Sequence, residues 1–83
     1  MAAILALLLL LNTGQTELDL VKDPQFILSF AQQLEREGDN FAAVSEYKRY
    51  MYLRGGDVDS VLYEIARIYQ KVGLYENALD IMD

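Results

Sequence analysis

The feature that most constrains this chain is a resemblance between two of its own segments. A shift of 35 residues places identical small residues on one another, in the pairs Ala31 and Ala66, Gly38 and Gly73, and Ala43 and Ala78. Large apolar residues also coincide, in the pairs Ile27 and Leu62, Phe30 and Ile65, Leu34 and Tyr69, Val44 and Leu79, and Tyr47 and Met82. Self-similarity at this period predicts a helical repeat.

Apolar residues within each segment follow helical spacing. They are Ile27, Phe30, Ala31 and Leu34 in the first segment, and Leu62, Ile65, Ala66 and Tyr69 in the second. Intervals of three and four residues place each set along one stripe of a helix. We therefore predict an all-α fold of antiparallel helical hairpins. The expected helices cover about residues 24–37, 40–54, 58–72 and 75–83.

Capping and turn residues support these boundaries. Asp23 precedes Pro24, so its carboxylate can accept from free backbone amides while proline occupies the first helical position. Gly38 and Gly73 fall where a chain leaving a helix often needs positive φ. Each hairpin is therefore expected to turn at its glycine.

The same residues carry a resemblance to the tetratricopeptide repeat. The two apolar sets match the first half of its pattern, and Ala43 with Tyr47 and Ala78 with Met82 match the second half. The resemblance implies a short right-handed solenoid of stacked hairpins. It places one repeat over residues 24–58 and an incomplete one over residues 59–83. The alternative is an unrelated pair of helical hairpins.

Residues 1–16 form a separate segment. Ala2 to Leu11 is an uninterrupted apolar run of ten residues, too short to cross a bilayer but within the range of a signal-peptide hydrophobic region. No Lys or Arg precedes the run, and residues 12–16 offer a poor cleavage site. We predict a signal peptide, a linker over residues 17–23, and export to a bacterial periplasm or cell envelope. The alternative is a leucine-rich helix packed on the repeats, with a cytoplasmic protein. A membrane contact is expected only through an uncleaved form of this segment.

Composition closes several classes of chemistry. The chain contains no His and no Cys, which excludes an imidazole base, a thiolate nucleophile, and a zinc site made of these ligands. Asp57 and Asp59 lie before a predicted helix, where capping explains them better than a calcium site does. We therefore expect no enzyme activity, no metal and no cofactor.

Nucleic acid is not an expected partner. Helix 40–54 interleaves tyrosines with basic residues, a pattern that single-stranded nucleic acid can use. However, Tyr47 occupies a core position of the repeat, Tyr50 lies on the same face, and the net charge of the chain is −6. We interpret these tyrosines as core residues beside a basic outer strip, because a negative field disfavours binding to phosphates.

The first candidate site comes from the family resemblance. In tetratricopeptide repeats the first helix of each pair lines a concave groove that often holds a peptide or a partner helix. The resemblance assigns this role to Leu28, Gln32, Glu35 and Arg36 in the first hairpin, and to Tyr63, Arg67, Gln70 and Lys71 in the second. Tyr63 and Arg67 are the type of pair that anchors interfaces. The alternative is that Tyr63 packs on a neighbouring helix and Arg67 is solvated by water.

The second candidate site is an apolar edge. Because the returning helix of the second hairpin is short, it is expected to expose a patch formed by Tyr69, Tyr75, Leu79 and Met82. Large exposed apolar patches often mark contacts between proteins. The predicted function is a protein–protein interaction module that acts as an adaptor or scaffold. The alternatives are a structural repeat that associates with itself through this edge, and the N-terminal fragment of a longer tetratricopeptide repeat protein.

Overall fold

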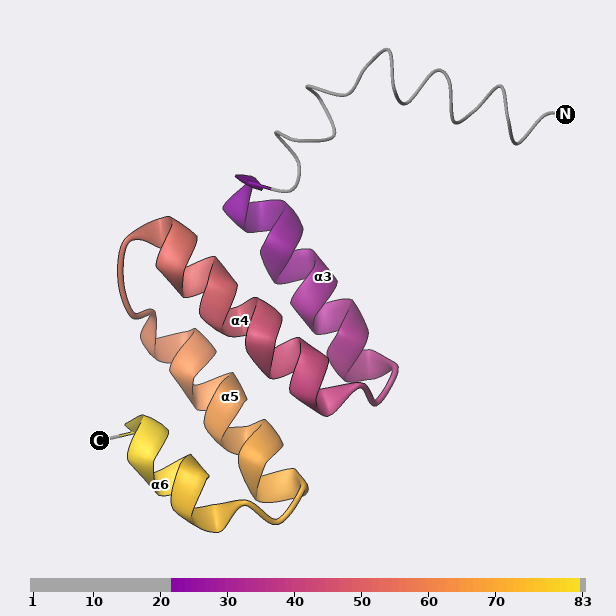
Figure 1. Cartoon of the computed structure of the whole chain (residues 1–83), viewed down its shortest axis with the longest axis vertical. Helices are drawn as coiled ribbons and strands as arrows, with labels where there is room; N and C mark the ends of the chain where they lie inside the picture. Colours follow the sequence, from indigo (N-terminus) through magenta and orange to yellow (C-terminus); the bar gives the residue numbers. More distant parts are fainter. Residues whose placement is uncertain (1–21, 83) are drawn as a thin grey trace, which may run out of the picture.

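The computed structural model describes residues 22–82, and within this range the chain is helical apart from short turns. The helices, labelled as in Figure 1, are α3 (Pro24–Arg36), α4 (Asn40–Arg54), α5 (Asp59–Lys71) and α6 (Tyr75–Met82). The all-helical prediction is confirmed, and the predicted boundaries agree with the observed ones to within a residue. The expectations for residues 1–16, and for most of the linker, lie outside the described residues.

Local chemistry explains where α3 begins. The carboxylate of Asp23 accepts a hydrogen bond from the backbone N–H of Gln25 at 3.0 Å, and Pro24 occupies the first helical position. One free amide of the first turn is satisfied in this way, and proline sacrifices no hydrogen bond there. The predicted cap is therefore present.

The two hairpins turn by the same device. Gly38 and Gly73 have φ values of 83° and 86°, in the left-handed region that glycine adopts without steric cost. The residue after each glycine donates its backbone N–H to the carbonyl five positions earlier, Asp39 to Leu34 at 2.9 Å and Leu74 to Tyr69 at 2.8 Å. Both bonds satisfy carbonyls that the end of a helix leaves free. The two halves of the repeat thus have matching turns.

The helices pack in chain order. α3 packs on α4 and α5 packs on α6, while a contact between α4 and α5 joins the two pairs. Figure 1 shows the members of each pair running antiparallel, with α3 and α6 at opposite edges of the described structure. The first hairpin therefore has the second hairpin on its α4 side.

The core lies between α3, α4 and α5. Its buried side chains are Ile27 and Ala31 of α3, Ala43, Val44, Tyr47, Tyr50 and Met51 of α4, and Val61, Ile65, Ile68 and Tyr69 of α5. Tyr47 and Tyr50 are only 2% and 4% exposed, which confirms their interpretation as core residues. Helix α6 contributes no buried residue.

Two aromatic residues depart from their expected environments. Phe30 belongs to the predicted apolar stripe of the first segment but is 44% exposed, whereas its repeat equivalent Ile65 is fully buried. The reason is that α5 packs against α4 of the preceding hairpin, and no preceding hairpin lies among the described residues. Tyr69 was expected on the exposed edge but is buried in the core, so its assignment to that edge is wrong. It faces α4, where Lys48 donates to its hydroxyl at 3.2 Å.

Candidate functional site

A hollow of about 590 Å³ lies where α3, α4 and α5 meet, and is called here the groove hollow. Its lining consists of Leu28, Gln32, Glu35 and Arg36 from α3, Tyr47 and Tyr50 from α4, and Ser60, Val61 and Glu64 from α5. The four residues that the resemblance assigned to the first helix therefore line one hollow. Residues from both hairpins form its walls.

Glu35 and Tyr47 make a polar contact in the wall of the groove hollow. The Tyr47 hydroxyl donates to Oε1 of Glu35 at 2.8 Å, and the tyrosine ring is buried. Burial raises the pKa of Tyr47 above its ordinary value, and the nearby Glu64 carboxylate acts in the same direction, while Arg36 opposes them. The hydroxyl therefore stays protonated through the neutral range and holds α4 to α3.

Arg67 ties the two hairpins together. Its guanidinium binds the carboxylate of Glu35 on α3 and also that of Glu64, one turn earlier on α5, at 2.8 Å. One cation thus lies between the two carboxylates of the groove hollow and offsets their mutual repulsion. Arg67 is therefore paired with two carboxylates, while 42% of its side chain remains exposed to water.

A second hollow, of about 380 Å³, lies between α5 and α6 and is called here the edge hollow. It is lined by Tyr63, Ala66, Arg67 and Gln70 of α5 and by Tyr75, Ala78, Leu79 and Met82 of α6. Three of the four groove residues expected on the second hairpin, Tyr63, Arg67 and Gln70, line the edge hollow. They are therefore separate from the α3 residues, which line the groove hollow. Lys71 lines neither hollow.

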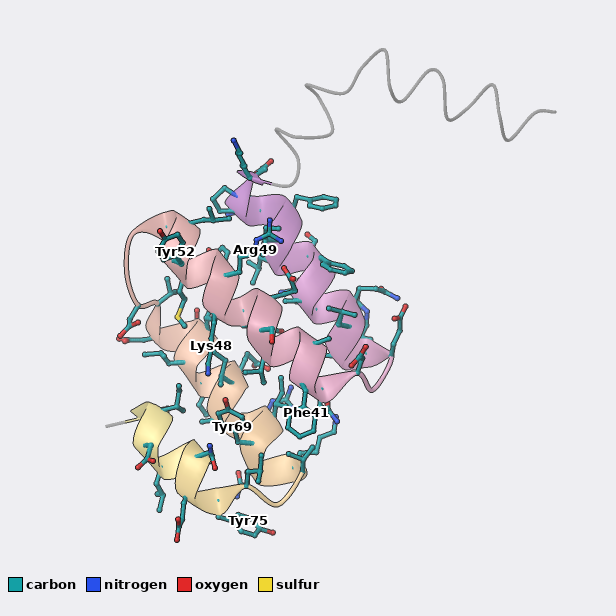
Figure 2. The ribbon with its side chains drawn as sticks, viewed as in Figure 1. Phe41, Lys48, Arg49, Tyr52, Tyr69 and Tyr75 are labelled. Carbon is teal, nitrogen blue, oxygen red and sulfur yellow. The ribbon has the colours of Figure 1, made fainter. Side chains whose placement is uncertain are left out.

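The edge hollow is mostly apolar and open. Tyr63, Tyr75, Leu79 and Met82 are 59%, 63%, 69% and 55% exposed. Figure 2 shows Tyr75 projecting from the start of α6, away from the neighbouring helices. The exposure predicted for Tyr63 and for three of the four edge residues is confirmed, with Tyr69 as the exception.

The sequence interpretation missed five contributors to the groove hollow. Tyr47 and Tyr50 of α4 were expected only as core residues, and the α5 residues expected in the groove did not include Ser60, Val61 or Glu64. Glu64 lies one helical turn before Arg67, and this opposite-charge spacing was a usable indication of an ion pair. No comparable pattern marks Ser60, because its position depends on how α5 crosses the first hairpin.

Basic residues of α4 contact tyrosines of the same chain. Lys48 lies 5.8 Å from the centre of the Tyr69 ring, and the Arg54 guanidinium donates to the Tyr50 hydroxyl at 2.9 Å. Figure 2 shows Lys48 extending from α4 toward Tyr69 on α5. These two cations therefore stabilise the packing of tyrosine rings within the fold.

The described residues hold no cluster of three or more potential metal-ligating carboxylates. Between residues 22 and 82, no helix has the length and apolar character needed to span a bilayer. Comparison with known proteins finds no matching family model, no similar curated protein and no similar solved structure.

Proposed function

We propose that this chain is a protein-interaction module of the tetratricopeptide-repeat type, with its two hairpins stacked as a short right-handed solenoid. The 35-residue repeat, the matching glycine turns and the contact between α4 and α5 support this arrangement. The activity we propose is binding of a partner protein, without catalysis. The groove hollow is the binding surface.

The composition of the groove hollow is the observation that carries this proposal. Its apolar side chains come from Leu28, Tyr47, Tyr50 and Val61, and its polar ones from Gln32, Glu35, Arg36, Ser60 and Glu64. An apolar pocket with a few polar groups fits a bulky side chain and orients the chain that presents it. The partner segment is therefore a peptide that inserts an aromatic or aliphatic side chain.

Charge further defines the partner. Glu35 and Glu64 are both engaged by Arg67, while Arg36 donates to Gln33 at 2.7 Å and keeps further guanidinium donors for a ligand. A carboxylate beside the inserted side chain would complement Arg36 in both charge and geometry. We therefore propose a peptide with a bulky apolar residue next to an acidic one.

The groove is also held in shape before any ligand binds. Tyr47 and Arg67 both contact Glu35, so α3, α4 and α5 share one polar junction. A preformed site costs less conformational entropy on binding than one that must be assembled. This supports recognition by the groove itself rather than by a folding transition.

A displayed peptide library selected against the full chain tests the proposal. Selected peptides should share an acidic residue next to a bulky apolar one. Ser60→Trp places a large side chain in the groove hollow and should weaken their binding at least tenfold in fluorescence anisotropy. Ser45→Trp is the matched control, because Ser45 is exposed on α4 and lines neither hollow. Equal binding to both variants would show that the groove is not the site.

We also propose that residues 1–16 direct export, on the basis of the apolar run from Ala2 to Leu11. Expression of the full chain in a bacterial host, followed by fractionation and intact-mass measurement, tests this step. A periplasmic product that begins near residue 17 supports export. A cytoplasmic product that retains Met1 contradicts it.

A further inference from the structure

The two outer edges of the described structure carry exposed apolar residues of different kinds. At one edge, Leu79 and Met82 of α6 are 69% and 55% exposed beside the edge hollow. At the other edge, Phe26 and Phe30 of α3 are 43% and 44% exposed. Figure 1 shows that α3 and α6 lie on opposite sides of the helix stack. No described residue covers either surface.

The repeat relates both edges to the junction inside the molecule. A shift of 35 residues carries Phe26 and Phe30 onto Val61 and Ile65, which are 4% and 0% exposed. Val61 and Ile65 belong to α5, which packs on α4 of the first hairpin. The exposed α3 surface is thus the repeat equivalent of a surface that the second hairpin buries against the first.

The opposite half of that junction has an exposed equivalent as well. The same shift carries Val44 and Tyr47 of α4 onto Leu79 and Met82 of α6. Val44 and Tyr47 are 5% and 2% exposed, on the helix against which the second hairpin packs. One chain therefore displays both complementary halves of a junction that it already makes internally.

From this correspondence we infer that a second copy of the chain docks head to tail, with its α3 against the α5–α6 edge of the first copy. The contact would repeat the internal junction of the hairpins across two molecules. This inference goes beyond the proposed groove function, and uses neither Ser60 nor Arg36. Because the two contacting surfaces differ, the association can continue beyond a dimer.

Size and charge at the equivalent positions are compatible with this docking. Phe26 and Phe30 are larger than their equivalents Val61 and Ile65. The α6 edge offers space for them, because Met82 stands where the internal junction has Tyr47 and the edge hollow is open. The ion pair between Arg67 and Glu35 has Gln32 and Gln70 as its equivalents. Two amides can hydrogen-bond to each other, so this pair brings no unpaired charge into the contact.

Reciprocal surface variants of the full chain test the inference. Phe26→Gln with Phe30→Gln disables the α3 surface, and Leu79→Glu with Met82→Glu disables the α6 edge. Sedimentation velocity should show a mass that rises with concentration for the wild type, and a monomer for each variant alone. An equimolar mixture of the two should form a heterodimer of twice the 9.5 kDa chain mass and nothing larger. Only one pair of intact surfaces remains in that mixture.

Tyr52→Gln is the matched control, because Tyr52 is 83% exposed and has no part in the inferred contact, so this variant should associate like the wild type. Far-UV circular dichroism checks that each variant keeps its helices. If a double variant loses them, the single variant Phe30→Gln replaces it on the α3 surface, and Leu79→Glu replaces it on the α6 edge. A wild type that stays monomeric at about 200 µM, roughly 200 times a Kd of about 1 µM, overturns the inference. Self-association of the α3 variant would also overturn it, because the α6 edge would then pair with itself. Association that neither variant changes would overturn it as well.

Discussion

The first and second hairpins share a sequence pattern but not an environment. Ala31 and Ala43, at the crossing of α3 and α4, are completely buried, while their equivalents Ala66 and Ala78 remain partly exposed between α5 and α6. The first hairpin has α5 packed against its second helix, and α6 has no such neighbour among the described residues. In a repeat structure burial depends on the neighbouring unit, so equivalent positions carry different energetic weight. Substitutions at paired positions can therefore measure what a neighbour contributes.

The largest effect is expected for Ile65→Ala compared with Phe30→Ala. Ile65 is fully buried, so its truncation should cost about 2–5 kcal/mol through lost burial and a residual cavity. Phe30 is the larger side chain but is 44% exposed, so its truncation should cost about 1 kcal/mol. Urea unfolding followed by circular dichroism, at low protein concentration to avoid association, gives both values. Equal losses would contradict the difference in burial between the hairpins.

A smaller effect is expected from enlarging the alanines of the second helices. Ala43→Leu forces extra atoms into a site with no exposed surface and should destabilise the fold by about 1–3 kcal/mol. Ala78→Leu borders the edge hollow, where space is open, and should change stability by less than about 1 kcal/mol. Thermal unfolding of the two variants side by side makes the comparison. A loss for Ala78→Leu as large as that for Ala43→Leu would mean that the second hairpin is packed as tightly as the first.

The connection between the hairpins should show a modest electrostatic coupling. A double-mutant cycle of Arg67→Gln and Glu35→Gln should give less than about 1 kcal/mol, because the arginine side chain is 42% exposed and solvent screens the pair. The coupling should shrink further in about 1 M NaCl, where the Debye length is near 3 Å. Urea unfolding at low and high salt measures it. A coupling that is unaffected by salt would indicate that the contact is maintained by packing instead of charge.

The smallest effect is expected in the alkaline range, at Tyr47 of the first hairpin. The pKa of Tyr47 is raised by burial and by Glu64, so the folded chain holds this proton more tightly than the unfolded chain does. Its contribution is therefore fully present below about pH 10 and is lost as the pH rises through the folded pKa. Tyr47→Phe should make the decline of stability above that pH shallower, as measured by urea unfolding at several pH values. An unchanged pH dependence would remove Tyr47 as a cause. The equivalent position of the second hairpin holds Met82, which does not titrate.

Local features of the sequence were sufficient to predict the helices. Asp23 caps α3, and Gly38 and Gly73 adopt positive φ at the two turns, as expected from residue type and spacing. These predictions succeeded because caps and turns depend on atoms within a few residues of one another. The four residues that the resemblance assigned to the first helix line one hollow, since residues one turn apart share a helix face wherever the helix packs.

Environment could not be predicted in the same way. Phe30 and Ile65 occupy the same position of the repeat, yet one is half exposed and the other buried, and Tyr69 is in the core instead of on the edge. Arg67 joins Glu35 across 32 positions of sequence, and Ser60 reaches the groove only because α5 crosses the first hairpin. The 35-residue repeat by itself determined the helices, the turns and which side chains share a stripe. Only the tertiary structure decided which stripes are covered, because burial is a property of two surfaces in contact and a periodic pattern describes one surface at a time.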